Sequence, residues 1–350
     1  MFKTRKSIAT VVGLALLGFL VCMVAGWGVL AIALRGPHDE TLRNALAALF
    51  AIASLATLLA LASRRWRWRA LGSYLAALVA LGVWWSGIEP SNDRQWQADV
   101  AALPHATIDG DLVTVHNIRN FAYRSETDYT PAWYDKRFDL RKLQGVDLVA
   151  VYWMGPAIAH IFLSFDFGDG DHLAVSIETR KEEGEGYSTL KGFFREYEQY
   201  YVVADERDVI RLRTNYRQDP PEDVYVYPLQ GDLDNGRRLF LEYMKRINSL
   251  RERPEFYNTL TSNCTTSIWM NTRVNPGHLP LDWKILASGY VPQFLYEQGR
   301  LVSHGLPFAE LQQRVHVNDR AQAADAAEDF SRRIREPRAG VTVEGREAAR

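Results

Sequence analysis

Hydrophobic residues are concentrated in three long runs in the first quarter of the chain, at residues 7–34, 42–62 and 70–88. An α-helix needs about 20 apolar residues to cross a bilayer, and each run comes close to or exceeds that length. The first run is too long for the apolar core of a cleavable signal peptide, and two further runs follow it. The pattern therefore predicts a membrane domain of three transmembrane helices within residues 1–90.

Basic residues flank these runs and indicate how they are oriented. They are Lys3, Arg5 and Lys6 before the first run, and Arg64, Arg65, Arg67 and Arg69 between the second and third runs. Because short cytoplasmic segments are enriched in Lys and Arg, the N-terminus is predicted to be cytoplasmic. Three crossings then place the rest of the chain outside the cytoplasm. In a bacterium this describes a multi-pass protein of the inner (cytoplasmic) membrane with a periplasmic C-terminal domain.

After residue 90 the hydrophobic pattern changes to short strand-like and helix-like segments. Strand patterns lie at residues 111–116, 146–153, 160–167, 172–180 and 224–229, and helical patterns lie at residues 192–200, 235–250 and directly after Cys264. This mixture predicts an α+β domain over residues 91–316, in which a mainly antiparallel sheet packs against helices. Residues 317–350 are rich in Ala, Glu, Asp and Arg without a sustained apolar stripe, which predicts a disordered tail.

Charge and ligand patterns limit the classes of partner. The chain has 41 Lys and Arg against 42 Asp and Glu, a net charge of −1, so no nucleic-acid partner is indicated. The histidines lack the spacing of a zinc site, and residues 166–171 lack the spacing and terminal Glu of a calcium loop. We expect no metal or organic cofactor. The expected partners are membrane lipids, with lipoproteins as a further candidate, and the sequence does not set the oligomeric state.

Cys264 is the main candidate for chemistry. The only other cysteine, Cys22, lies in the first apolar run, so the water-facing part of the chain cannot form an internal disulfide. Polar residues up to Asn263 can cap a helix that begins near Cys264. The free N–H groups and positive dipole at such a helix start favour the thiolate, which is the reactive form of cysteine. A lone cysteine is also often a small buried hydrophobe, so this hypothesis needs a partnering base.

His160 is the candidate base, and the next strand offers a carboxylate to orient it. The strands at 160–167 and 172–180 are joined by Gly168-Asp169-Gly170, a hairpin signal. A three-residue loop places Glu178 opposite His160 on the same face, whereas a two-residue turn places Thr179 there. The first register gives the histidine the orienting partner that a general base needs.

Several segments of this domain also resemble a known family. They are residues 116–124 (HNIRNFAYR), 159–160 with 164–165, 176–182 (SIETRKE), 205–208 (DERD), 254–260 (PEFYNTL) and 263–266 (NCTT). Together, over about residues 115–270, they resemble the Lnb N-terminal periplasmic domain, whose namesake is a lipoprotein N-acyltransferase. Because the histidine precedes the cysteine, the domain also resembles the circularly permuted branch of the papain-like and NlpC/P60-like folds.

The resemblance implies thiol-dependent acyl transfer close to the membrane. We therefore predict a membrane-anchored periplasmic acyltransferase that acts on lipid or lipoprotein substrates, with Cys264 as nucleophile, His160 as base and Glu178 orienting His160. The candidate substrate contacts are Arg119, Arg180, Arg211 and Asn263, and Arg213 is an alternative to Arg211. One alternative is a periplasmic cysteine hydrolase (peptidase, amidase or esterase) that uses water as acceptor. The second is a non-catalytic module that binds lipid or lipoprotein and has an inert thiol.

Overall fold

The computed structural model describes residues 2–336, with the side chains of residues 8–336. The chain forms two compact units. Among the described residues, the first contains residues 2–91 together with Ser188–Glu196, and the second contains Asn92–Tyr187 and residues 197–336. Each unit is described separately below.

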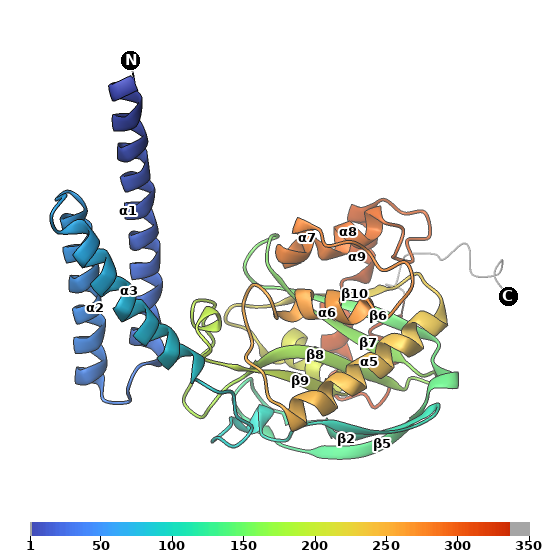
Figure 1. Ribbon diagram of the computed structural model, residues 1–350. Coiled ribbons are helices and arrows are strands. Elements are labelled where there is room, and N and C mark those ends of the chain that lie inside the picture. The colour runs from blue at the N-terminus through green and yellow to red at the C-terminus, as the bar shows by residue number, and fades with distance from the viewer. Residues whose placement is uncertain (1, 337–350) are drawn as a thin grey trace. The chain divides into compact units, whose positions relative to one another are not determined.

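The first unit consists mainly of three helices, α1 (Phe2–Arg35), α2 (Glu40–Leu61) and α3 (Arg67–Ser86) (Figure 1). Asp39 caps α2 by accepting a hydrogen bond from the Leu42 N–H. The segment Ser188–Glu196, with the 3-10 turn η3 (Lys191–Phe193), belongs to this unit. Its Arg195 donates a hydrogen bond to the Trp85 carbonyl at the end of α3 over 2.7 Å.

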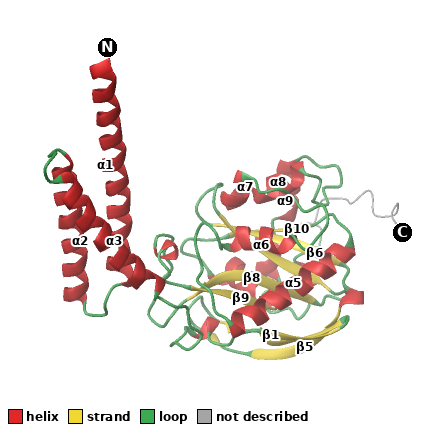
Figure 2. Cartoon of the chain, in the orientation of Figure 1, coloured by secondary structure: helices red, strands yellow, loops and turns green. Residues whose placement is uncertain are grey.

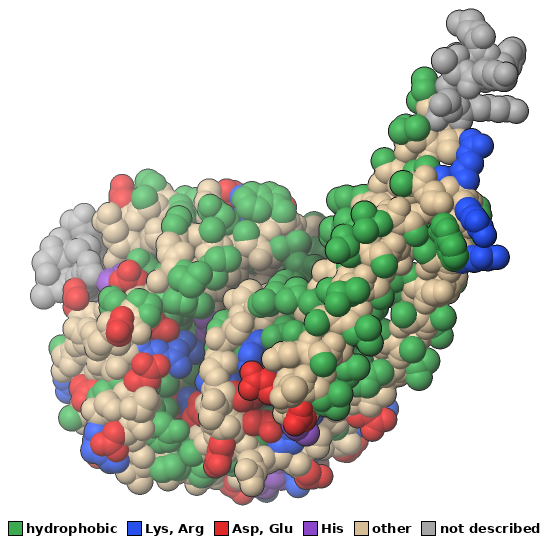
Figure 3. All heavy atoms as spheres, turned by 90° about the vertical axis from the view of Figure 1, so that its left-hand side faces the viewer, with side chains coloured by type: hydrophobic (Ala, Val, Ile, Leu, Met, Phe, Trp, Pro, Cys, Tyr) green, Lys and Arg blue, Asp and Glu red, His purple; other side chains and the backbone are tan. Residues whose placement is uncertain are grey.

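Among the described residues, two helices rather than the predicted three are long and apolar enough to cross a membrane: Ile8–Arg35 and Glu40–Leu61. The predicted span over residues 70–88 corresponds to α3, which is not one of them. Polar and amphipathic side chains such as Ser73, Tyr74 and Trp84 dilute the hydropathy of α3, and Arg67 and Arg69 lie in its first turn. Figure 3 shows hydrophobic side chains over the exposed surface of the helices and a group of basic side chains near one end.

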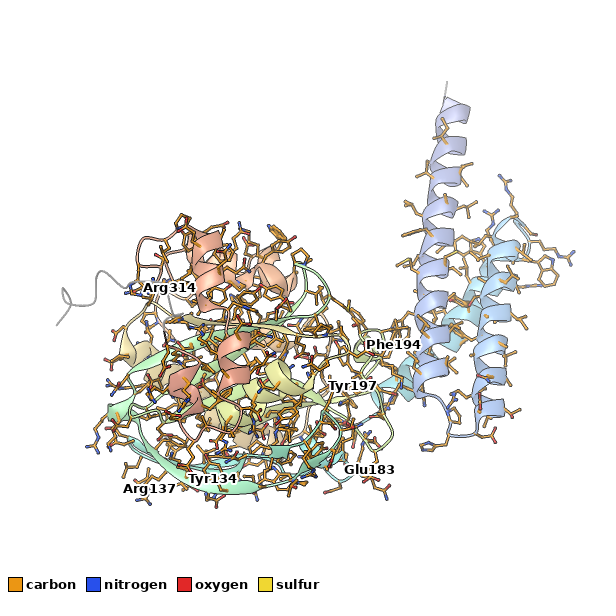
Figure 4. All side chains as sticks on the ribbon, turned by 180° about the vertical axis from the view of Figure 1, so that it is seen from behind. Tyr134, Arg137, Glu183, Phe194, Tyr197 and Arg314 are labelled. Carbon is orange, nitrogen blue, oxygen red and sulfur yellow. The ribbon has the colours of Figure 1, made fainter. Side chains whose placement is uncertain are left out.

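The second unit contains, within its described residues, an eight-stranded sheet in the order β1-β2-β9-β8-β7-β6-β10, with β5 also paired to β2. The strands are β1 (His105–Asp109), β2 (Leu112–Arg119), β5 (Trp133–Asp139), β6 (Gly145–Tyr152), β7 (Ala159–Asp166), β8 (His172–Arg180), β9 (Glu198–Ala204) and β10 (Asp223–Pro228). Two short strands, β3 (Ala122–Tyr123) and β4 (Tyr129–Thr130), pair with each other. Tyr134, which is labelled in Figure 4, lies on β5 and donates a hydrogen bond to Asp205.

Helices cover the sheet (Figure 2). They are α4 (Glu206–Arg211), the π-helical η4 (Leu212–Tyr216), α5 (Leu233–Glu252), α6 (Cys264–Thr272), α7 (Trp283–Leu286), α8 (Val291–Glu297), α9 (Phe308–Val315), α10 (Asn318–Ala323) and α11 (Phe330–Arg333), with 3-10 turns η1 (Ala98–Val100), η2 (Leu140–Lys142) and η5 (Ser288–Tyr290). Every strand pair except β2–β9 is antiparallel. The predicted α+β architecture with a mainly antiparallel sheet is therefore confirmed.

Side chains that alternate along the strands build one hydrophobic core on each face of the sheet. On β7, Ile161, Leu163 and Phe165 pack in the core that also contains Phe240 of α5. Phe162 points to the opposite face and joins the core built with α4, α10 and α11. The period-two pattern seen in the sequence thus becomes a sheet with helices on both faces.

The expected helix over residues 192–200 is wrong, because β9 begins at Glu198. All seven residues of β9 are buried, and the strand lies between β2 and β8. A strand that is buried on both faces does not alternate between polar and apolar residues, so it lacks the usual strand pattern. Tyr and Val, which favour strands, make up most of residues 200–203.

The prediction of a disordered tail is wrong for residues 317–336. Val317, Ala321, Phe330 and Ile334 are each at most 1% exposed and belong to the core under α10 and α11. These apolar residues are spread over two short helices, so no continuous stripe marks them in the sequence. The rest of the predicted tail, 337–350, lies outside the described residues.

Candidate active site

The hairpin between β7 and β8 has the register in which the loop contains three residues. Asp166 pairs with His172, and Leu163 pairs with Val175. The Phe167 N–H donates to the Asp171 carbonyl over 2.8 Å, which closes the loop around residues 168–170. If this register is continued along both strands, Glu178 lies opposite His160. Of the two registers that the sequence allowed, the structure therefore has the one that places Glu178 across from His160.

The two strands separate before they reach His160. Their pairing stops at Leu163 and Val175, although β7 begins at Ala159 and β8 continues to Arg180. Helix α6 packs against both strands. Backbone N–H groups of β7 that would otherwise pair with β8 are therefore available to other partners, and the Ile161 N–H interacts with the Cys264 sulfur.

Cys264 is the first residue of α6, as its polar flank predicted. Asn263 is the N-cap residue. Its side chain accepts a hydrogen bond from the Thr266 N–H, and the Thr266 hydroxyl accepts one from the Asn263 N–H, which completes a capping box. Cys264 is 9% exposed, and the Thr265 N–H also interacts with its sulfur. The thiol thus lies among the free N–H groups of a helix start, where negative charge is stabilised.

A chain of polar contacts leads away from Cys264. His160 hydrogen-bonds to the thiol. The His160 Nε2 atom lies 2.7 Å from the Ser176 hydroxyl, which donates to Glu178 Oε1 over 2.8 Å. Glu178 Oε1 lies 3.5 Å from His160 Nε2 and accepts a 3.0 Å hydrogen bond from Arg213. Glu178 is therefore held on one side by Arg213 and faces the histidine on the other, partly through Ser176.

These contacts shift the pKa values of Cys264 and His160 so that a thiolate paired with a protonated imidazole is favoured. Burial acts to raise the pKa of Cys264, but the hydrogen bond and charge of His160, with the Ile161 and Thr265 N–H groups, outweigh it and lower the pKa of the thiol. Burial and Arg213 act to lower the pKa of His160, yet Cys264 and Glu178 raise it overall. Burial disfavours ionised Glu178, but His160 and Arg213 bring its pKa well below the ordinary value.

A thiolate beside an imidazolium is an activated nucleophile with a proton donor in hydrogen-bond contact. The His160 side chain is 14% exposed and the Glu178 side chain 23% exposed, so part of the site is open to solvent. The arrangement is therefore capable of attacking a carbonyl carbon and returning a proton to the leaving group.

The three arginines predicted to contact substrate lie in the protein interior with protein partners. Arg119 is 5% exposed and forms a two-pronged ion pair with Asp208. Arg180 is 2% exposed and donates to the carbonyls of Val100 and Ala101. Arg211 is 6% exposed and donates to the Asp325 carbonyl over 2.8 Å. These side chains hold loops and helices against the sheet and do not present their charges to a ligand.

Asn263 and Arg213 also differ from their predicted roles. The amide of Asn263 caps α6 and donates to the Thr259 carbonyl over 2.7 Å, so both of its ends bind protein. Arg213, which the sequence offered only as an alternative to Arg211, is the arginine that reaches the site. The bridging role of Ser176 was missed. Its place on the same strand face as Glu178 was the available signal, because residues two apart in a strand share a face.

One group among the described residues could hold a metal ion by composition: Asp147, His172 and Glu206, all buried. Arg335 already provides a positive charge to this group. The guanidinium lies 2.5 Å from an Asp147 oxygen and 2.6 Å from a Glu206 oxygen. The carboxylates are therefore neutralised by a side chain of the protein itself.

The geometry thus defines an α+β domain with a Cys–His pair at a helix start. Residues 129–289 match the family model of the Lnb N-terminal periplasmic domain, which supports the resemblance that the motifs predicted. The matched segment includes His160, Glu178 and Cys264, and it begins and ends later than the 115–270 expected from the motifs. No curated protein and no solved structure matches the chain. The likeness to permuted papain-like enzymes therefore stays a prediction.

The family match and the apolar helices together indicate where in the cell the protein lies. The family is that of a periplasmic domain, and two helices that could cross a membrane precede it in the chain. These findings support a membrane-associated protein with a periplasmic domain.

Proposed function

We propose that this protein is a membrane-anchored periplasmic acyltransferase that uses Cys264 to transfer acyl groups from or to lipids and lipoproteins. The observation that carries the proposal is the Cys264 thiol at the capped start of α6, hydrogen-bonded to a histidine that Ser176 and Glu178 hold in place. The shifted pKa values of Cys264 and His160 favour the ion pair, which is the reactive form of such a site.

In the first half of the proposed reaction, the Cys264 sulfur attacks the carbonyl carbon of an ester. The S–C bond forms, the ester C–O bond breaks, and His160 gives its proton to the departing alcohol. The Ile161 and Thr265 N–H groups, which contact the sulfur, are positioned to stabilise the negative oxygen of the intermediate. In the second half, an amine attacks the thioester, His160 accepts the amine proton, and the thiolate leaves.

A periplasmic cysteine hydrolase is the second candidate function, and the partial exposure of His160 and Glu178 favours it because water can reach the base. Both functions share the acyl-enzyme intermediate and differ in the acceptor. The products separate them. When purified protein is incubated with a phospholipid and an amine-bearing lipopeptide, we expect mass spectrometry to find an N-acylated lipopeptide. Free fatty acid as the sole product would instead assign the protein to the hydrolases.

We also propose that the N-terminus is cytoplasmic and that the anchor lies in the inner membrane. The N-terminus and the α2–α3 loop lie at the same end of the helices (Figure 1), and that loop contains the exposed Arg64 and Arg65. Basic residues favour the cytoplasmic side. A periplasmic domain then requires α3 to enter the bilayer as well, despite its lower hydropathy.

Cysteine labelling of intact cells tests this orientation. In a background with Cys22→Ser and Cys264→Ala, single cysteines at His38, Ser63 and Lys142 would be treated with a membrane-impermeant maleimide. His38 follows α1, Ser63 follows α2, and Lys142 is exposed in the second unit. We expect labelling at His38 and Lys142 and protection at Ser63. If the cysteines placed at Ser63 and Lys142 are labelled to the same extent, α3 does not cross the membrane.

A further inference from the structure

A cavity lined by residues of β6, β7, α5, α6 and α8 lies beside Cys264. Its volume is about 270 Å³. Ile161 and Thr265, whose N–H groups contact the Cys264 sulfur, both line it. We infer that this cavity holds the acyl chain attached to Cys264. Its size would then limit how many carbon atoms of the chain contribute to binding. The inference rests on the proposed function and deepens it by assigning the acyl-binding residues.

The inner wall of the cavity is apolar and comes from several elements. Leu148 of β6, Leu163 of β7, Leu239 of α5, Ile268 of α6 and Phe294 of α8 line it, and all five are buried. Such a wall offers no hydrogen-bond partner for a peptide or sugar, whereas each methylene buried against it contributes about 0.8 kcal/mol. A hydrocarbon chain is therefore the ligand that fits this wall.

The strand register shows that the cavity is elongated. Ile161 lies on β7 near Cys264, whereas Gly145 of β6, which also lines the cavity, pairs with Asp166 at the other end of β7. Five residues of strand separate Ile161 from Asp166, which corresponds to roughly 17 Å. A long, narrow space along the strands suits an extended chain better than a compact ring.

Polar residues border the cavity away from Cys264. They include Asp232, Asn235, Asn275, His278 and Arg300, of which Asp232 and His278 are exposed. An acyl chain that extends past the apolar wall meets these groups and water, so additional methylenes gain nothing there.

The volume sets the number of carbons that the apolar wall can hold. A dry protein cavity of about 150 Å³ accommodates one benzene molecule, so this cavity has room for roughly ten carbon atoms. We expect acylation of Cys264 to increase with chain length up to about ten carbons and then to level off.

Val146 offers a way to change the cavity without touching the reacting groups. It lines the cavity, is half-buried, and pairs with Phe165 on β7, far from His160, which pairs with Val151. Val146→Phe should fill the distal end and move the plateau to chains several carbons shorter. Val146→Ala should enlarge that end and move the plateau to longer chains. Val315→Phe is the matched control, because Val315 is also half-buried against the same core but does not line the cavity.

The experiment uses the full-length protein in detergent and p-nitrophenyl esters with chains of increasing length. Mass spectrometry of the intact protein measures the rate at which Cys264 becomes acylated. The expected result is a shift in opposite directions for Val146→Phe and Val146→Ala and none for Val315→Phe. Identical chain-length profiles in all variants, with acylation intact, would overturn the cavity assignment and leave the proposed function standing.

A different result would overturn both. If no ester acylates Cys264 in the unmodified protein, although iodoacetamide alkylates it readily, the proposed function fails and the cavity assignment fails with it. Two further arms replace the esters with phosphatidylethanolamine or with a diacylglyceryl lipopeptide. The arm that produces acylated Cys264 identifies the source of the chain, and we expect Val146→Phe to lower its yield.

Discussion

Replacing Cys264 by alanine is expected to lower the rate of acyl transfer by about 10³-fold or more, because it removes the atom that forms the covalent intermediate. The side chain is small and buried at the first position of α6, and Asn263 and Thr266 form the capping box without it. The helix should therefore still form. The rate would be measured with an ester donor, and circular dichroism would follow thermal unfolding.

Cys22→Ser is the matched control for this variant, since it removes the other thiol of the chain, which lies on α1 in the first unit. It should leave the rate unchanged. The nucleophile assignment does not survive if Cys264→Ala transfers acyl groups at a rate close to that of the unmodified protein. If Cys264→Ala alone is inactive but has also lost its cooperative unfolding transition, Cys264→Ser provides the second test, because its hydroxyl keeps a similar volume.

Replacing Arg335 by methionine is expected to destabilise the second unit by about 3–5 kcal/mol, the usual cost of removing one partner from a buried ion pair. Arg335 contacts Asp147 and Glu206, which are 8% and 1% exposed. Burial acts to raise the pKa of Glu206, but Arg335 outweighs it and brings the pKa to about 2. Burial raises the pKa of Asp147 even with Arg335 in place. Without Arg335, two buried carboxylates would repel each other.

The same network predicts a dependence on pH. Because the folded-state pKa of Glu206 is below its unfolded value, its contribution to stability is present above that unfolded value of about 4.3 and is lost as the pH falls toward 2. In Arg335→Met, buried carboxylates without a cation take up protons more readily. The stability deficit of the variant should therefore shrink as the pH is lowered from 7 toward about 5.

Arg332→Met is the matched control, because Arg332 lies in α11 only three residues before Arg335. The Arg332 side chain is 61% exposed, and its partners Asp329 and Glu336 lie at the surface. Exposed ion pairs contribute about 0–1 kcal/mol, so this variant should unfold almost like the unmodified protein. Urea denaturation of both variants measures the difference. If both variants lose only a similar, small amount of unfolding free energy, Arg335 does not hold the C-terminal helices in place.

Features encoded by neighbouring residues could be predicted from the sequence. The polar residues before Cys264 indicated a helix start, and the structure has α6 beginning at Cys264 with Asn263 as its cap. The Gly168-Asp169-Gly170 loop limited the hairpin to two registers, one of which brings Glu178 to His160. In both cases a few adjacent residues determine the local geometry, so a short stretch of sequence contains the needed information.

Features that depend on distant residues could not be predicted. Arg213 and Arg211 are two residues apart in a charged segment, and only the path of α4 and the π-helical turn η4 decides which one reaches Glu178. The ion pairs of Arg335 join residues 188 and 129 positions apart in the chain. The cavity likewise arises between strands and helices from separate segments, so no single stretch of sequence marks it.

The measurement that tests the central claim most directly is the rate of alkylation of Cys264 as a function of pH, in a Cys22→Ser background, with and without His160→Ala. An ordinary thiol with a pKa of about 8.5 is only about 1% ionised at pH 6.5. Because His160 lowers the pKa of Cys264, we predict that the rate at pH 6.5 is well above that of an ordinary thiol and falls toward the ordinary profile when His160 is removed. An ordinary thiol profile that does not change in His160→Ala would contradict the Cys–His pair and favour a non-catalytic lipid-binding module.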